Sequence, residues 1–284
     1  DPSISFEYDV NEDLMVYASR NEAFRSGGFN ASATAPNQAG KTYGEDFVFD
    51  AEEIVAYELG FKSDLMEKRL RVNGAVYHYE LKNEQFNIPK ALLLRTAREI
   101  VNTSGDFYGA EIDIIALIGE KLTASFNYAY TSGDLDPVIN PNLCTTVATG
   151  AEAECSGSAG APGVGQSANS VDYRNDIIGN SENSATFALG YVDELENGVG
   201  VRGHLDYSWK TQRETSPGVF TDERHLVNAN VRFDYPEGQY VTLWSKNLLD
   251  ESYRVDGLGF ETFAHRTHIF GEPRTFGVTV GMNF

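Results

Sequence analysis

Several residue types are scarce in this chain, and each shortage excludes a class of protein. No apolar run approaches the roughly 18 to 20 residues that a membrane-spanning helix requires, so no helical span is expected within these 284 residues. Basic residues are also few: 22 Lys and Arg stand against 42 Asp and Glu, which gives a formal net charge of -20. Because nucleic acids are bound through clusters of Lys and Arg, this charge argues against DNA or RNA as a partner.

Motifs of catalysis are also missing. The Gly-rich stretch at 157–165 has neither the Lys nor the strand-to-helix context of a phosphate loop. Ser, His and Asp are present but never in a nucleophile elbow. We therefore expect no enzyme and no cofactor. One group of residues could share a metal: His265 and His268, with Arg266 between them. No Cys or acidic third ligand is near. The alternatives are that these residues contact a ligand or belong to a solvated loop.

Cysteine occurs only twice, at Cys144 and Cys155, within one stretch rich in Ala, Gly, Ser and Thr. A metal site would want more His or Cys partners close by. The pair therefore predicts a local disulfide, which indicates an oxidising compartment such as the periplasm or the cell exterior.

Alternation of apolar and polar residues is the pattern that the chain has in abundance. It recurs at 55–62, 122–130, 199–210 and 227–235, and it is clearest at the end of the chain. Successive side chains of a strand point to opposite faces, so each such segment has one apolar and one polar face, as a membrane barrel needs. The apolar residues of the last segment are Phe276, Val278, Val280, Met282 and Phe284.

Turn residues divide the pattern into about eleven strands whose connections alternate in length. Short turns are expected at 9–13, 64–68, 119–120, 194–198 and 236–238, and long loops at about 26–50, 88–104, 134–183, 214–224 and 254–271. Bacterial outer-membrane barrels have short periplasmic turns and long extracellular loops. We therefore predict an all-β, antiparallel transmembrane β-barrel whose longest extracellular loop is about 134–183. The predicted strands are 3–9, 13–25, 51–64, 69–87, 105–118, 121–133, 184–194, 199–213, 225–236, 239–253 and 272–284.

Short motifs in a fixed order resemble the TonB-dependent receptor family, in particular its iron-complex branch. The resemblance covers nearly the whole chain, and no single motif carries it. The motifs are Tyr17–Ser19 leading to Phe24–Asn30, then Tyr57–Lys62, Gly109–Glu111, Asn247–Asp250 with Tyr253, Gly271–Arg274, and the closing Phe284.

This resemblance implies a barrel of about 22 strands with a filled lumen, so residues 1–284 would be its C-terminal portion. The N-terminal plug and the other half of the barrel would be missing partners, since an open half exposes unpaired strand edges. The resemblance further implies coupling to the TonB complex through the plug. It also implies that the barrel-assembly machinery reads the terminal strand that ends at Phe284.

The implied function is active uptake of a ferric siderophore or a similar bulky nutrient across the outer membrane of a Gram-negative bacterium. A passive porin or adhesin barrel is the alternative, and a soluble β-sandwich or β-rich enzyme is a third hypothesis. A small-molecule metal chelate would meet inward residues near the outer rim, where Arg and His suit anionic groups. The candidates are Arg25, Asn30, Arg213, Arg254, His265, Arg266 and His268.

Overall fold

The computed structural model describes residues 1–30, 48–92, 95–136, 139–146, 166–170, 181–216, 219–260 and 265–283. All secondary-structure elements assigned within these ranges are β-strands. No helix in the described part of the chain is long and apolar enough to cross a membrane.

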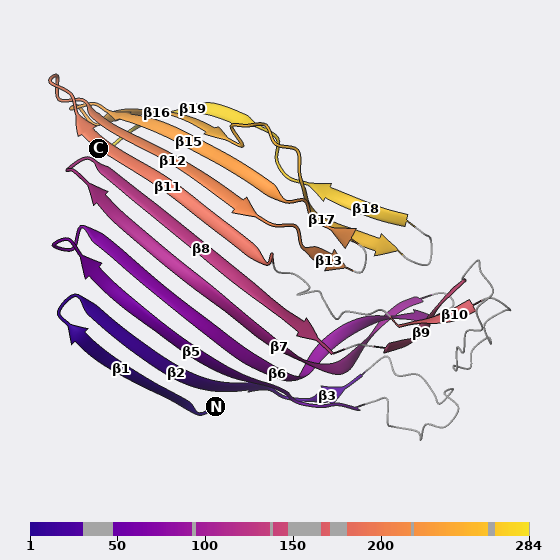
Figure 1. The fold of residues 1–284 in the computed structure, drawn as a ribbon. Helices are drawn as coiled ribbons and strands as arrows, with labels where there is room; N and C mark the ends of the chain where they lie inside the picture. Colours follow the sequence, from indigo (N-terminus) through magenta and orange to yellow (C-terminus); the bar gives the residue numbers. More distant parts are fainter. Residues whose placement is uncertain are drawn as a thin grey trace.

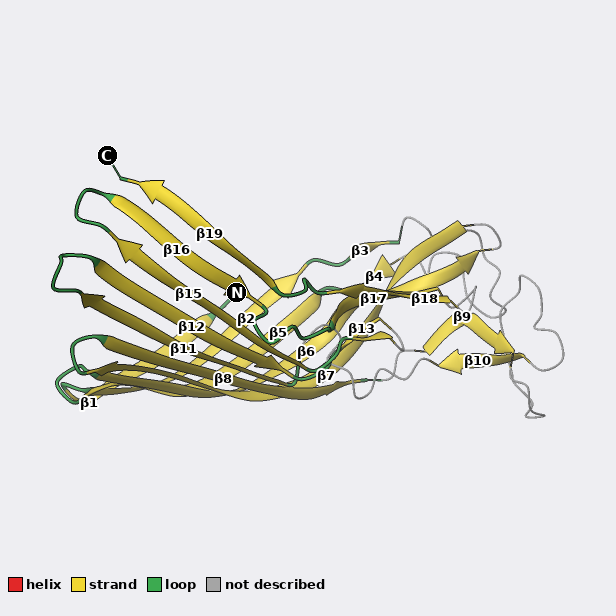
Figure 2. Ribbon diagram, turned by 90° about the horizontal axis from the view of Figure 1, so that it is seen from above, coloured by secondary structure: helices red, strands yellow, loops and turns green. Residues whose placement is uncertain are grey.

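Eleven strands form one antiparallel sheet in which each strand pairs with the next one of the set, so the prediction of about eleven antiparallel strands is confirmed (Figure 1). The sheet is curved, and the part from β1 to β7 passes behind the part from β8 to β19 (Figure 2). It is not closed, because β1 and β19 are its two edges. The strands are β1 (Ser3–Asn11), β2 (Leu14–Arg25), β5 (Glu52–Leu65), β6 (Leu70–Leu92), β7 (Arg95–Ile118), β8 (Leu122–Leu135), β11 (Asn183–Glu194), β12 (Gly200–Lys210), β15 (Arg224–Asp234), β16 (Gln239–Lys246) and β19 (Thr275–Met282).

Short turns lie at one end of the sheet and long connections at the other, as predicted (Figure 1). The turn residues explain the tight ends: Gly198 and Gly238 adopt positive φ, which glycine tolerates without a steric penalty. We call the end with the long connections the outer rim. Four two-stranded sheets stand in these connections: β3 (Gly28–Phe29) with β4 (Val48–Phe49), β9 (Ile139–Thr146) with β10 (Gln166–Ser170), β13 (Glu214–Ser216) with β14 (Val219–Phe220), and β17 (Arg254–Phe260) with β18 (His265–Phe270).

Register extends the two-faced pattern across the sheet, because directly opposite residues of paired strands share a face. Leu189, Leu205 and Ala229 face one another on the apolar side. The apolar side is not covered by a second layer: Phe276 is 80% exposed and Val280 is 72% exposed. This exposure contradicts the β-sandwich hypothesis, in which such residues would be buried. Polar-face residues of β2, β5, β6, β7, β8 and β11 line one shared pocket, so the polar face is the concave side, where a barrel would enclose its lumen.

Aromatic rings lie across opposite glycines at four positions on the polar face. The pairs are Tyr17 with Gly60, Tyr77 with Gly109, Trp244 with Gly277, and Tyr240 with Gly281. A Cβ at Gly60 would lie 2.5 Å from the ring of Tyr17, so the absence of a side chain makes room for the ring. Such aromatic cover protects the glycine backbone in twisted sheets. It also holds the Tyr17 hydroxyl where it donates a hydrogen bond to Glu58 Oε1 at 2.5 Å.

The predicted loop at 88–104 is wrong. β6 and β7 continue past the membrane-crossing length as one hairpin that reaches Leu92 and Arg95. A register shift between Leu81 and Glu84, with Asn83 at φ 53°, marks where the hairpin bends away from the sheet. The hairpin forms because residues with high β-propensity occur on both strands beyond this bulge, as in the pair Phe86 and Val101.

The predicted strand at 239–253 is also too long, because β16 ends at Lys246. Asn247 and Asp250 adopt positive φ and turn the chain. The Asn247 side chain, which is 4% exposed, closes this turn. Its Oδ1 accepts from the Glu251 N–H at 2.9 Å and its Nδ2 donates to the carbonyls of Glu251 and Glu272. The Asn-Leu-Leu-Asp motif is therefore a braced turn at the outer rim.

Candidate functional site

A pocket of about 350 Å³ lies on the polar face at the outer rim. We call it the rim pocket. Strands β8, β11, β12 and β15 and the connections before β11 and between β12 and β15 contribute to it. The lining residues are Ala129, Thr131, Ser181, Ser184, Lys210, Thr211, Arg213, Thr221, Asp222 and Arg224.

Three cationic side chains converge on this pocket. Lys210 ends β12 and lies opposite Arg224 at the start of β15, so the register places both on the polar face. Arg213 enters from the connection that follows β12. Its backbone is fixed by Thr221, whose N–H donates to the Arg213 carbonyl at 2.9 Å and whose Oγ1 accepts from the Arg213 N–H at 3.1 Å. The pocket is therefore locally basic in a chain of net charge -20.

Asp222 is the one carboxylate that lines the rim pocket, and Arg254 of β17 holds it. Asp222 Oδ1 accepts from Arg254 Nε at 2.9 Å and also from Nη2, while Oδ2 accepts from the Arg254 backbone N–H at 2.8 Å. Charge-assisted bonds of this kind favour the ionised acid. The Arg254 guanidinium accordingly lowers the pKa of Asp222 below its ordinary value.

The connections β13–β14 and β17–β18 pack together behind the pocket, and we call them the outer loop unit. Val219 of β14 is 0% exposed, and its Cγ1 would lie 2.5 Å from a Cβ at Gly257 of β17. Thr221 and Tyr253 are also buried. The Arg224 guanidinium lies 5.8 Å from the centroid of the Tyr253 ring, a cation–π contact. Packing and the Asp222–Arg254 pair thus hold one wall of the pocket.

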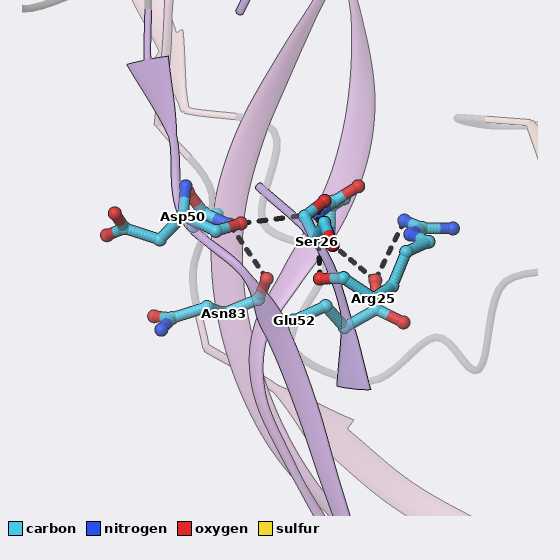
Figure 3. A network of polar contacts seen from close by, with 7 residues as sticks. Arg25, Ser26, Asp50, Glu52 and Asn83 are labelled. Atoms are coloured by element: carbon cyan, nitrogen blue, oxygen red, sulfur yellow. Dashed lines mark hydrogen bonds and ion pairs between the residues drawn. The ribbon is translucent and has the colours of Figure 1, made fainter. Parts of the chain in front are cut away.

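A second polar cluster lies where β2 and β5 reach the outer rim, and it contains Arg25 (Figure 3). Arg25 Nη2 lies 2.8 Å from Glu52 Oε2, an oxygen that also accepts from the Gln85 N–H at 3.0 Å. Gln85 Nε2 donates to the carbonyls of Ser26 and Asp50 at 2.9 and 3.2 Å. These contacts brace the β6–β7 hairpin against the chain between β2 and β5, and they engage the Arg25 guanidinium.

Asn30 follows β3 and is 6% exposed. Its amide exchanges two hydrogen bonds of 2.8 Å with the backbone of Ile100 in β7. The side chain thereby acts as an additional strand partner for the β6–β7 hairpin. This contact ties the connection after β2 to that hairpin.

The sequence profile described as "TonB dependent receptor-like, beta-barrel" matches residues 1–248. The chain belongs to this family of TonB-dependent receptors. The family prediction made from the short motifs is therefore confirmed, and so is the all-β, antiparallel barrel fold, which remains open in this chain.

Solved siderophore receptors share the fold of this TonB-dependent receptor chain. The ferric yersiniabactin uptake receptor FyuA from Yersinia pestis superimposes with a TM-score of 0.70 at 14% identity, over 99% of this chain and 37% of that one. The siderophore receptor PiuA from Acinetobacter baumannii gives 0.64 at 14% identity, over 98% and 35%. The ferric-catecholate import receptor Fiu from Escherichia coli K12 gives 0.60 at 18% identity, over 99% and 34%. This receptor chain thus spans about a third of the length of these structures.

The structure brings three of the predicted ligand-binding residues of the receptor together. Arg213 lines the rim pocket, Arg254 binds its carboxylate, and His268 of β18 lies close enough for its charge to contribute to the lowered pKa of Asp222. Arg25 and Asn30 lie instead in the contacts that brace the β6–β7 hairpin.

Other predicted residues stay as predictions. The side chains of His265 and Arg266 are outside the described part of β18, as is that of Cys144 in β9, and Cys155 and Phe284 lie outside the described residues altogether. Phe276, Val278, Val280 and Met282 form the apolar face of the edge strand β19.

Sequence reasoning missed three charged residues of the rim pocket: Lys210, Asp222 and Arg224. The alternation of β12 already places Lys210 on the polar face, with Asp206 and His204. Lys210 could have been predicted from its place on the polar face at the end of a strand that leads into a long loop. Nothing in the sequence pairs Asp222 with Arg254, because 32 residues separate them.

Proposed function

We propose that the full-length protein is an active transporter of the outer membrane of a Gram-negative bacterium that imports a ferric siderophore or a similarly bulky metal chelate. Membership of the TonB-dependent receptor family supports this proposal. The observation that carries it is the basic rim pocket, which opens on the polar, lumen-side face at the end of the sheet with the long connections.

In this proposal, residues 1–284 are the C-terminal portion of the barrel. They supply an outer-membrane wall with an apolar face toward lipid and a polar face toward the lumen. An N-terminal plug and the other barrel half complete the transporter, and the TonB complex acts through the plug. The strand β19 and Phe284 provide the signal for the barrel-assembly machinery, and Cys144 with Cys155 forms a disulfide in the long extracellular loop.

Transport in this scheme needs no covalent chemistry. A chelate binds at the outer rim, where the outer loop unit and the rim pocket present fixed donors, and the plug then opens at the expense of energy supplied from the inner membrane. The barrel is the scaffold and the outer binding surface. A passive porin or an adhesin would lack the energy-dependent step.

The test is uptake of ⁵⁵Fe-labelled chelates by cells that carry or lack the full-length gene, grown under iron limitation. Uptake should require both the gene and a functional TonB complex, and it should fall in the double variant Lys210→Met/Arg224→Met. Lys82→Met is the matched control, because Lys82 lies opposite Glu53 on the other face of the sheet. Uptake that continues without TonB would indicate a passive pore and overturn the proposal.

A further inference from the structure

We propose that Glu84 makes the attachment of the β6–β7 hairpin at the outer rim sensitive to pH. The hairpin docks most firmly when the Glu84 carboxyl group carries a proton, and it loosens when this group ionises. The proposal concerns a conformational change of the outer rim, and it holds whether or not the full-length protein transports a chelate.

Glu84 is the residue at which the β6–β7 ladder resumes after the bulge. The register shifts between Leu81 and Glu84, and Glu84 then lies opposite Thr103 of β7. Thr103 is two residues from Gly105, the partner of Leu81, so Glu84 points to the same polar face as Leu81. The side chain therefore stands on the concave side, at the point where the hairpin bends away from the sheet.

The surroundings of the Glu84 carboxyl group disfavour its charge. The side chain is half-buried, and its Oε2 atom is buried without a hydrogen-bond donor among the described residues. The carboxylate of Glu52 on β5 adds a like charge, and Arg25 of β2 is the cation that opposes it. Burial and then Glu52 raise the pKa of Glu84 above its ordinary value of 4.5, although Arg25 acts in the opposite direction.

The one guanidinium near these two acids is engaged by Glu52. Arg25 Nη2 lies 2.8 Å from Glu52 Oε2, and the same oxygen accepts from the Gln85 N–H at 3.0 Å. Of the other described neighbours, Tyr79 of β6 interacts electrostatically with Glu84 but is not a cation, and Thr103 on β7 is neutral. Ionised Glu84 would therefore be a second, poorly compensated negative charge beside Glu52.

Hydrogen bonds on both sides of Glu84 hold the hairpin against the chain between β2 and β5 (Figure 3). The neighbouring Gln85 donates through Nε2 to the carbonyls of Ser26 and Asp50. On β7, Asn102 Nδ2 donates to the carbonyl of Asn83 at 2.7 Å, and its Oδ1 accepts from the Asp50 N–H at 2.7 Å. Loosening of these contacts would return the Glu84 carboxyl group to water.

Docking of the hairpin is strongest in acid because proton binding and docking favour each other. Below the ordinary pKa of 4.5, Glu84 is protonated in the docked and the open hairpin alike, so its charge does not oppose docking. As the pH rises through the higher pKa of the docked state, the docked hairpin must hold a half-buried carboxylate that the open hairpin exposes to water. Docking weakens over this interval. The direction is opposite to that of Asp222, whose lowered pKa makes the outer loop unit loosen in acid.

Amide hydrogen exchange of the full-length receptor in detergent, followed by mass spectrometry, tests the proposal. Each measured rate is divided by the intrinsic rate at the same pH, which leaves the protection of the amides. Protection of peptides that cover 84–103 should be at least about threefold higher at about pH 4 than at about pH 8. The amides of β12 should show no such step.

Variants assign the step to Glu84. Glu84→Gln has no proton to lose and should keep the higher, acid-like protection at every pH. Glu80→Gln is the matched control, because Glu80 lies opposite Asp106 on the other face of β6, and it should retain the wild-type step. Glu52→Gln should move the step to lower pH, since it removes the neighbouring carboxylate and releases Arg25 from its ion pair.

Equal protection of 84–103 at the two pH values in the wild type would overturn the proposal, as would a step of unchanged size in Glu84→Gln. Heat-modifiable migration in gel electrophoresis shows whether each variant folds as a barrel. Should Glu84→Gln fail to fold, Glu52→Gln decides the question, and a step that stays at the wild-type pH in that variant contradicts the role of Glu84.

Discussion

Arginine placed at Val231 should destabilise the barrel strongly, whereas arginine at the neighbouring Asn230 should not. Val231 lies on the apolar face of β15, opposite Gly203 and Leu243, and is 38% exposed to the space that lipid would fill. It is also midway between Val227 and Tyr235 along the chain, which places it near the centre of the apolar band. An arginine on the lipid face at mid-depth costs about 2–4 kcal/mol.

This cost corresponds to a shift of roughly 30-fold to nearly 1,000-fold in the folding equilibrium. The assay is a reversible denaturant titration of the full-length protein in liposomes, followed by tryptophan fluorescence. Asn230→Arg is the matched control, because Asn230 lies between His204 and Trp244 on the polar face, where an arginine reaches water. Equal penalties at the two sites, or a larger one at Asn230, would refute the assignment of the faces.

Three further outcomes follow from the described contacts. Val219→Ala should weaken the outer loop unit by about 1.5–3 kcal/mol, since Val219 is fully buried, and hydrogen exchange of the β17 amides should quicken while that of β12 stays unchanged. The lowered pKa of Asp222 stabilises the docked loops above the ordinary pKa of 3.8 and loses that effect as the pH falls through the lower native value. Exchange of the β17 amides should therefore quicken below about pH 4 in the wild type but show no such step in Asp222→Asn. Gly60→Ala should cost about 1–3 kcal/mol because its Cβ would overlap the Tyr17 ring, whereas Gly190→Ala, with nothing within 4 Å, should be close to neutral in the same denaturant titration.

The strands of the main sheet were predictable because the two faces of each strand lie in different solvents. Lipid on one side and water on the other impose alternation on the sequence itself, as at Leu205 and Asp206. The tight turns were predictable for a similar reason, since Gly198 and Gly238 occupy backbone angles that favour glycine. In both cases the physical constraint acts on residues that are close together in the chain.

The errors at the outer rim arise where the structure depends on contacts between distant segments. The β6–β7 hairpin beyond Leu81 is held partly by Gln85 and Asn30, which bind the connection after β2 and the backbone of Ile100. The end of β16 depends on Asn247, whose amide reaches Glu272 across 25 residues. The sequence pattern alone predicts that the strand continues through this turn, because Leu248 and Leu249 are residue types that also occur within strands.

Contacts between distant segments also made most of the candidate site unpredictable from the sequence. A barrel wall has no interior of its own, so the completely buried side chain Val219 lies in the outer loop unit and not in the sheet. A single buried valine between two short strands leaves no periodic pattern to detect. Val219 packs against Gly257 in the same unit that holds the Asp222–Arg254 pair, and Asp222 lines the rim pocket. The Asp222 side of the rim pocket thus depends on loop docking, and we expect the Asp222–Arg254 pair to be lost if the two connections fold independently.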